Sequence, residues 1–199
     1  MAEPIKSDLR IIRTKKAIRQ TFYEMLSEMD YEKISIKELT KRACINRRTF
    51  YLHYSFLDEL LEEFMDELVS NYVNRTHNMN GLYDLPEITR QFLLFFAQQD
   101  SLHEKIICSK NFRYISDRIN QKIIEHNESH IDHIGSMNSY TKDIIITYLN
   151  TTVLEIYRKW VNDKKRIPLE DLINLATHLL CHGILSLPKY LSTKKNLTI

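Results

Sequence analysis

The sequence predicts an all-α protein, and three observations support that prediction. Glycine and proline are scarce, with 3 and 4 among 199 residues, whereas globular proteins average about 7% and 5%. Apolar residues recur at steps of three and four along most of the chain, which is the spacing of one helix face. No stretch of the sequence is a convincing strand. We therefore expect about nine helices, three of them in a small N-terminal domain.

Composition and pattern also exclude several classes of protein. Hydrophobic residues make up 43% of the chain and aromatic residues 10%, which is enough to close a core and excludes wholesale disorder. The longest apolar runs, such as 92–97, fall far short of the ~18 residues of a membrane span, and residues 1–10 lack an apolar signal core. Cys44, Cys108 and Cys181 are odd in number and widely spaced, as in a reducing compartment. We expect a cytoplasmic protein with no membrane segment.

The first predicted helix begins near Arg10 and ends near Asp30. Its apolar residues follow the helical spacing and form one stripe. They are Ala17, Ile18, Phe22, Met25 and Leu26. Lys15, Lys16 and Arg19 lie off that stripe. Asp30 is expected to end the helix in a left-handed conformation, which Asp tolerates better than most residues.

Two short helices are expected next. Residues 35–38 have the Ser-x-x-Glu pattern of a capping box, which satisfies free backbone N–H groups at a helix start. Residues 44–46 break that helix, and Asn46 can cap a second one over 47–53. Ile36, Leu39 and Ala43 form the expected buried face of the first short helix, and Phe50, Tyr51 and Tyr54 supply the bulky side chains of the second. Two short helices joined by about three residues form a helix-turn-helix pattern.

Six further helices are expected in the remainder of the chain. Their ranges are 56–74, 84–99, 102–108, 111–128, 141–162 and 168–187. Pro86 lies in the first turn of the helix at 84–99, where proline is tolerated. The segments 75–83 and 126–140 are polar and are expected to be loops.

Positive charge is concentrated at the start of the chain. Residues 1–54 carry 12 Lys and Arg against 7 Asp and Glu, a net charge of +5, and the remaining residues carry −3. A basic head on a slightly acidic body indicates a polyanion partner for the head. Chance segregation of solvated charges would give the same distribution, so charge alone does not decide between the two interpretations.

Residues 35–60 resemble the DNA-binding segment of the TetR family of bacterial transcription regulators. The matching stretches lie at 35–39, 43–46, 49–54 and 58–60, in the order cap, short helix, turn, aromatic pair and acidic helix start. The resemblance covers roughly 13–61, and beyond it only the helix count and Trp160 agree with the family. Four residues depart from the family pattern. These are Asp30 and Cys44 at customary glycines, Thr40 at a usual alanine, and Leu57 at a commonly phosphate-contacting lysine.

The resemblance and the physics of groove reading together imply a DNA-binding surface. A helix in the major groove reads bases with its N-terminal side chains, while flanking groups hold phosphates. The implied DNA-binding residues are Ser35, Lys37, Asn46, Arg47, Arg48, Thr49, Tyr51 and His53. Arg47 and Arg48 can contact guanine or phosphate. On the alternative interpretation the arginines are a solvated face and the tyrosines are core aromatics, which we favour for Tyr54 alone.

Proteins of the TetR family generally hold an effector between the middle helices of the C-terminal domain. The resemblance therefore implies a ligand pocket there, mostly apolar with a few hydroxyls. The candidate pocket residues are Phe92, Phe95, Phe96, Phe112, Ile115, Ile119, Tyr148 and Thr152. A packed core is the alternative, and it is the better interpretation for most of these residues taken singly.

The last two predicted helices are expected to form a homodimer interface. Each has an apolar surface broader than one intramolecular contact needs, and pairing both with their copies makes a four-helix interface. The candidate interface residues are Ile145, Leu149, Ile156, Leu172, Leu175, Ala176, Leu179, Leu180 and Gly183. Because one helix-turn-helix covers only a half-site, a dimer predicts a palindromic operator. The alternative is that both helices pack only into their own core.

The sequence offers little for metal binding or catalysis. His178, Cys181 and His182 share a helix face and have the chemistry of zinc ligands, but no fourth ligand is evident. His126, His130 and His133 lie in a polar segment and are expected to be solvated. No nucleophile elbow, phosphate-binding glycine loop or Cys-x-x-Cys pair occurs. We expect no metal, no cofactor and no enzymatic activity.

Together these features predict a two-domain regulator of transcription. Residues 1–54 would be the helix-turn-helix DNA-binding domain, and residues 55–199 the effector-binding and dimerisation domain. The expected function is repression at a double-stranded DNA operator, relieved by a small-molecule effector. The alternative is an activator or co-regulator whose C-terminal domain binds a partner protein.

Overall fold

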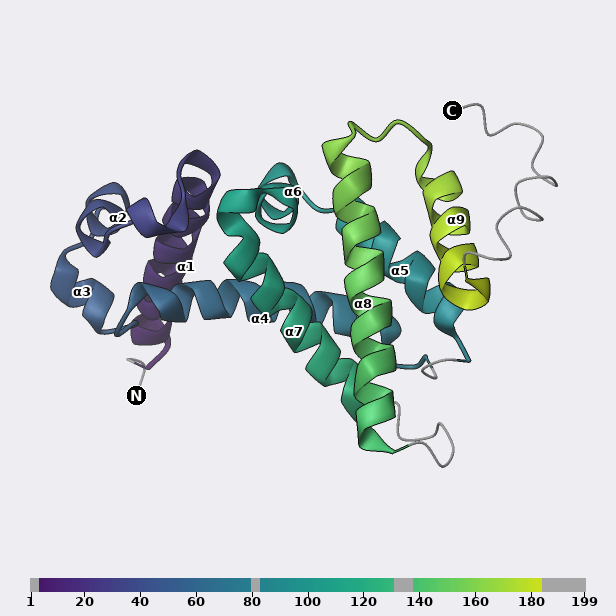
Figure 1. Ribbon diagram of the computed structural model, residues 1–199. Helices are drawn as coiled ribbons and strands as arrows, with labels where there is room; N and C mark the ends of the chain where they lie inside the picture. The colour runs from purple at the N-terminus through teal and green to yellow at the C-terminus, as the bar shows by residue number, and fades with distance from the viewer. Residues whose placement is uncertain (1–3, 80–82, 131–137, 184–199) are drawn as a thin grey trace.

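The computed structural model describes residues 4–79, 83–130 and 138–183, which contain nine α-helices, two 3-10 helices and no strand (Figure 1). The all-α prediction is confirmed. The α-helices are α1 (Pro4–Glu28), α2 (Ile36–Arg42), α3 (Arg47–Tyr51), α4 (Leu57–Thr76), α5 (Leu85–Ala97), α6 (Ser101–Cys108), α7 (Arg113–His130), α8 (Ser139–Asn162) and α9 (Leu169–His182). The 3-10 helices are η1 (Tyr31–Lys33) and η2 (Lys110–Phe112). Within the described ranges, no helix is both long and apolar enough to cross a membrane.

Helices α1, α2 and α3 form a head at one end of the molecule, and α4 leads from this head into a body built from α5 to α9 (Figure 1). In the body, α4 contacts α5 and α7, α7 packs on α8, and α9 packs mainly on α5. The head also contacts the body directly, because α1 touches α6. Helices α8 and α9 lie away from α2 and α3 (Figure 1).

One hydrophobic cluster runs through both parts of the molecule. In the head, Phe22, Leu39 and Phe50 have no exposed surface and pack with Phe64 of α4 in the same cluster. Removing such side chains from water is the main favourable term in folding. Because α4 supplies apolar residues to both parts, it fixes the head to the body.

The first helix begins earlier and ends differently than the sequence predicts. It starts at Pro4 rather than near Arg10, and its early turns carry exposed Leu9 and Ile12, so they have no packed stripe to signal a helix. Once a helix is nucleated, each added residue gains a hydrogen bond without a new nucleation cost. The left-handed prediction for Asp30 is wrong, because its φ of −72° and ψ of 149° are extended and lead into η1.

The ends of several other helices also differ from expectation. Helix α3 ends at Tyr51 rather than at 53, and α7 continues through 126–130, which the polar composition had suggested was loop. Helix α9 ends at His182, followed by Gly183 with a φ of 73°. With a ψ of 171° this backbone conformation is one that glycine adopts far more easily than other residues, so the helix ends there. The last residues of the predicted helix, 184–187, lie outside the described residues, as do 131–137 of the predicted loop.

Candidate functional site

The first helix of the helix-turn-helix is capped as the sequence predicts. The Ser35 hydroxyl accepts a hydrogen bond from the Glu38 amide at 3.2 Å. The Glu38 carboxylate accepts from the Arg42 side chain at 3.0 Å, so the reciprocal half of the capping box is replaced by an i, i+4 ion pair. The pKa of Glu38 is lowered chiefly by this hydrogen bond from Arg42. Lys37 is exposed on the same short helix.

The turn between the two helices depends on Cys44, which has a φ of +54°. The Ile45 amide donates to the Thr40 carbonyl at 3.0 Å and the Cys44 amide to the Lys41 carbonyl at 3.2 Å. These two bonds form a Schellman motif, whose left-handed position is usually glycine. The buried Thr40 hydroxyl finds its partner within the helix, donating to the Ile36 carbonyl at 2.8 Å. Neither departure from the family pattern therefore disrupts the turn.

The second helix is capped at its start and anchored at its centre. The Asn46 side-chain oxygen accepts from the Thr49 amide at 2.7 Å and from the Thr49 hydroxyl at 3.0 Å. Phe50 has no exposed surface and packs edge-to-face on Tyr51, with ring centroids 5.5 Å apart. Capping and anchoring hold α3 in one orientation, although it contains only five residues.

The two tyrosines after Phe50 have different environments. Tyr51 is 56% exposed, so the core interpretation is wrong for this residue. Tyr54 is buried and its hydroxyl donates to Glu63 of α4 at 3.0 Å, as the core interpretation expects. Burial, reinforced by Glu63, raises the pKa of Tyr54. His53 between them is partly exposed.

Positive charge on the head is divided between paired and unpaired side chains. Lys15 and Arg19 of α1 pair with acidic residues of α4, including Glu63 at 3.3 Å from the Lys15 Nζ. Arg47 and Arg48 are exposed, and their guanidinium groups form no ion pair or hydrogen bond with any described residue. The acidic residues of α4 therefore compensate the charges of Lys15 and Arg19, whereas the start of α3 keeps uncompensated positive charge. That is the arrangement a phosphate backbone attracts.

The residues expected to form the ligand pocket lie mainly in the hydrophobic cluster. The six buried members are Phe92, Phe95, Phe96, Phe112, Ile115 and Ile119, each no more than 3% exposed. The other two lie on the outside of α8, where Tyr148 is 53% exposed and Thr152 is partly exposed. The aromatic rings contact one another, as Phe92 and Phe96 do at 4.6 Å between centroids. The ligand pocket at these positions stays a prediction.

A different cavity, a groove of about 320 Å³, lies between α7 and α8. Among its lining residues are Arg113, Asp117 and Asn120 of α7 and Thr151, Glu155 and Arg158 of α8. None of the eight predicted pocket residues lines this groove. The sequence-based prediction therefore did not include this groove. The sequence did contain a sign of a buried polar cluster. Arg158 follows Tyr157 directly and lies one turn from Leu154, so a charged residue interrupts the apolar side of α8.

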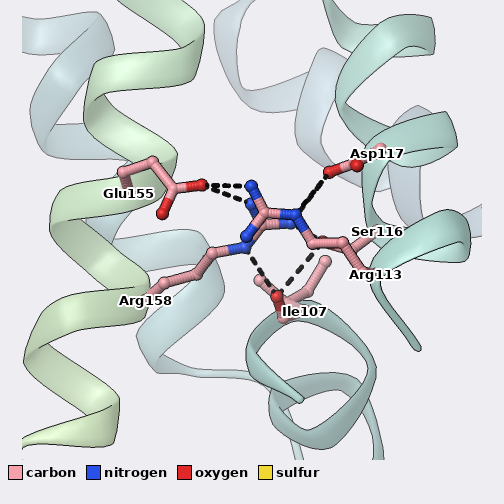
Figure 2. Close-up of polar contacts among 6 residues, drawn as sticks. All are labelled: Ile107, Arg113, Ser116, Asp117, Glu155 and Arg158. Atoms are coloured by element: carbon pink, nitrogen blue, oxygen red, sulfur yellow. Dashed lines mark hydrogen bonds and ion pairs between the residues drawn. The ribbon is translucent and has the colours of Figure 1, made fainter. Parts of the chain in front are cut away.

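Arg158 is 4% exposed and links three helices (Figure 2). Its Nε donates to the Ile107 carbonyl at the end of α6 at 2.9 Å. One terminal nitrogen lies 2.6 Å from Glu155 in α8, and the other contacts Ser116 and Asp117 of α7. A buried charge is tolerated when it is paired and hydrogen-bonded in this way. The cluster therefore fixes the end of α6 to the α7–α8 pair.

The predicted dimer residues divide into core and surface. Leu172 and Ala176 are buried within the chain, on α9, which packs chiefly against α5, so they serve its own core rather than a second chain. Partly exposed residues are Ile145, Leu149 and Ile156 on α8 and Leu175, Leu179 and Leu180 on α9. Gly183 follows α9 with a φ of 73°, which favours glycine, and its place in a dimer interface stays a prediction.

The histidines do not assemble a metal site in the part of the chain that is described. The rings of His178 and His182 stack with centroids 4.8 Å apart. Across residues 4–79, 83–130 and 138–183, no group of three or more His, Cys, Asp or Glu side chains is placed to hold a metal ion. His133 lies outside the described residues.

The capped helix pair with its exposed arginines is a helix-turn-helix, and most of the chain has the fold of known transcription regulators. A TetR transcriptional regulator from Streptococcus agalactiae matches 88% of this chain and 98% of its own, with a TM-score of 0.65 and 21% identity. FadR of Bacillus subtilis, solved in complex with stearoyl-CoA, matches 85% and 99%, with a TM-score of 0.59 and 16% identity. A TetR-like regulator from Rhodococcus matches 85% and 94%, with a TM-score of 0.56 and 15% identity.

Sequence comparison agrees over a shorter stretch. A segment of 68 residues is 34% identical to YxbF, an HTH-type transcriptional regulator of Bacillus subtilis, and it spans 34% of this chain and 18% of that protein. No model of a protein family matches the chain. The resemblance to the TetR regulators is thus confirmed at the level of the fold.

Proposed function

We propose that this protein is a sequence-specific, DNA-binding transcriptional regulator, and that it is a repressor released from its operator by a small-molecule effector. The observation that carries the proposal is the pair of exposed arginines at the start of α3. There, Arg47 and Arg48 are exposed and unpaired among the described residues, on a helix fixed by the Asn46 cap and by Phe50. A rigid helix with free guanidinium groups at its N-terminal end suits base reading in the major groove.

The proposal divides the chain into a DNA-binding domain, 1–54, and an effector-binding and dimerisation domain, 55–199. A homodimer is supported by partly exposed apolar residues on the last two helices. They are Ile145, Leu149 and Ile156 on α8 and Leu175, Leu179 and Leu180 on α9. Two heads related by a two-fold axis would read a palindromic operator. The bound stearoyl-CoA of FadR supports the idea that this fold accommodates an effector.

We also retain two further parts of the sequence interpretation. The protein acts without catalysis, and it works in the cytoplasm, where a regulator meets the DNA it controls. The comparisons do not favour the alternative of an activator that binds a partner protein.

The DNA-binding role is tested by selecting binding sites from random duplex DNA with the full chain, followed by fluorescence anisotropy on the enriched sequence. Arg47→Ala and Arg48→Ala should each weaken binding by about 1–3 kcal/mol if they read bases. Arg166→Ala is the matched control, because Arg166 is exposed in the loop between α8 and α9, which lies away from α2 and α3 (Figure 1). Failure to enrich any sequence, or unchanged affinity in both head variants, would contradict the proposal.

A further inference from the structure

The groove between α7 and α8 has a charged end and a less polar end. Arg113, Asp117, Glu155 and Arg158 surround one end, beside the end of α6. Further along, α7 contributes Ile124, and α8 contributes threonine hydroxyls. A ligand with a charged head and an uncharged tail would match both ends.

The charged end is balanced, with two guanidinium groups and two carboxylates. Both carboxylates bind these arginines through one oxygen each, Oε1 of Glu155 and Oδ1 of Asp117. Their second oxygens, and the Nη1 group of Arg113, form no hydrogen bond with any described residue. The same end therefore offers open acceptors for a cation beside an open donor for an anion. A ligand of one charge sign would use only the open donor or only the open acceptors, whereas a zwitterion uses both.

Asn120, one of the residues that line the groove, has a buried acceptor, its Oδ1, without a hydrogen-bond partner among the described residues. Buried polar atoms are normally paired, so an orphan of this kind calls for a donor. An ammonium group has three N–H donors and no acceptor. Rotation of the amide toward the groove would bring this oxygen to such a group.

We propose that the α7–α8 groove binds a zwitterionic α-amino acid with an uncharged side chain. The ligand carboxylate pairs with Arg113, and the ammonium group pairs with the free oxygens of Asp117 and Glu155 and with Asn120. The side chain lies toward Ile124. A cavity of about 320 Å³ is at the lower end of the range for small-molecule sites, which fits a ligand of this size.

The groove is linked to the head by a short chain of contacts through α6. Arg158 holds the Ile107 carbonyl of α6 at 2.9 Å. Two residues earlier, Lys105 donates to the carbonyls of Leu26 and Ser27 at the end of α1, at 3.0 and 2.9 Å. A ligand ammonium group on Asp117 and Glu155 weakens the attraction of these carboxylates for Arg158. The position of α6 against α1 changes as a result. This regulatory part of the inference rests on the proposed function, and the binding part does not.

A dimer through α8 leaves the groove open. Thr147, Thr151, Leu154 and Arg158 line the groove and follow one helical stripe at steps of four, three and four. The proposed dimer stripe, which runs through Ile145 and Ile156, is offset from it by two residues. An offset of two residues places the stripes on nearly opposite sides of a helix. The amino acid can therefore enter in either oligomeric state.

Binding is tested by isothermal titration calorimetry of the full chain with each proteinogenic L-α-amino acid in turn at millimolar concentration. We expect saturable binding of one or a few with uncharged side chains, lost when the same amino acid is N-acetylated or amidated. Arg113→Gln and Asn120→Leu should weaken binding at least tenfold, while Arg166→Gln should leave it unchanged. Arg113 is half-exposed, so its variant keeps the test decisive even if the Asn120 variant fails to fold. Absence of binding by every amino acid, or binding that both variants retain, would overturn the site.

Coupling is tested by repeating the DNA titration with the amino acid that binds. We expect operator affinity to change by roughly five- to a hundredfold, and Lys105→Gln to abolish that change while amino-acid binding persists. Binding without any change in DNA affinity keeps the site and overturns the link through α6. A chain that binds no DNA at all would refute the proposed function, and the calorimetric result for the groove would stand independently of it.

Discussion

Replacing Arg158 with methionine removes the charge that ties α6, α7 and α8 together while keeping most of the apolar volume. The change deletes hydrogen bonds to the Ile107 carbonyl, Ser116 and Glu155. We expect the body of the protein to be destabilised and the end of α6 to lose its fixed position. The helices of the head, whose buried residues Phe22, Leu39 and Phe50 do not contact Arg158 through any hydrogen bond, should form as before.

The structure sets the size of the effect. Hydrogen bonds to charged groups contribute about 1.5–3 kcal/mol each, and breaking a fully buried ion pair costs about 3–5 kcal/mol because the remaining charge is stranded. Here the partners are not stranded, since Glu155 and Asp117 are 46% and 57% exposed and return to water. The Ile107 carbonyl also keeps the Ser116 hydroxyl as a donor at 3.1 Å. The expected loss is therefore about 2–3 kcal/mol, or roughly 4–12 °C in Tm for a chain of this size.

Urea denaturation followed by circular dichroism measures this loss. Arg113→Met is the matched control, because Arg113 pairs with the same Glu155 and Asp117 but its side chain is 55% exposed. Exposed pairs contribute about 0–1 kcal/mol, so this variant should lose no more than that. Equal losses in the two variants, or an Arg158→Met protein as stable as the parent, would refute the argument that burial makes Arg158 the essential member.

Three further predictions address the head, the thiols and the dimer. Cys44→Gly should raise the free energy of unfolding by about 1 kcal/mol because it relieves the left-handed conformation, while Cys44→Ala should stay within about 0.5 kcal/mol; equal gains would show that the backbone is not the cause. Burial raises the pKa of Cys108 to about 12, so its thiol stays protonated at mildly alkaline pH and should react with a disulfide reagent only after unfolding, unlike exposed Cys44; rapid labelling of both would contradict this. Leu179→Glu should yield monomers in light scattering and weaken operator binding together, and a dimer of full affinity would exclude α9 from the interface.

What the sequence alone determined is chiefly local. The Ser35 and Asn46 caps join a side chain to an amide three residues ahead, so residue types at fixed spacing suffice to predict them. The same holds for the helical stripes, whose period is set by the backbone. These features were enough to identify the helix-turn-helix and the all-α fold, because each needs only neighbours along the chain.

Tertiary structure decided which residues of the same type are buried and paired and which are exposed. Tyr51 and Tyr54 are chemically identical, and the resemblance to a known family gave the expectation that only Tyr54 is buried; in the structure Tyr54 packs beside Phe50 and its hydroxyl donates to Glu63 of α4. Arg47 and Arg158 are likewise indistinguishable by type, and only packing leaves the first free and surrounds the second with partners from α6 and α7. The groove between α7 and α8 arises in the same way. Burial and pairing depend on contacts between segments distant in sequence, and the spacing of residues along one helix does not encode them.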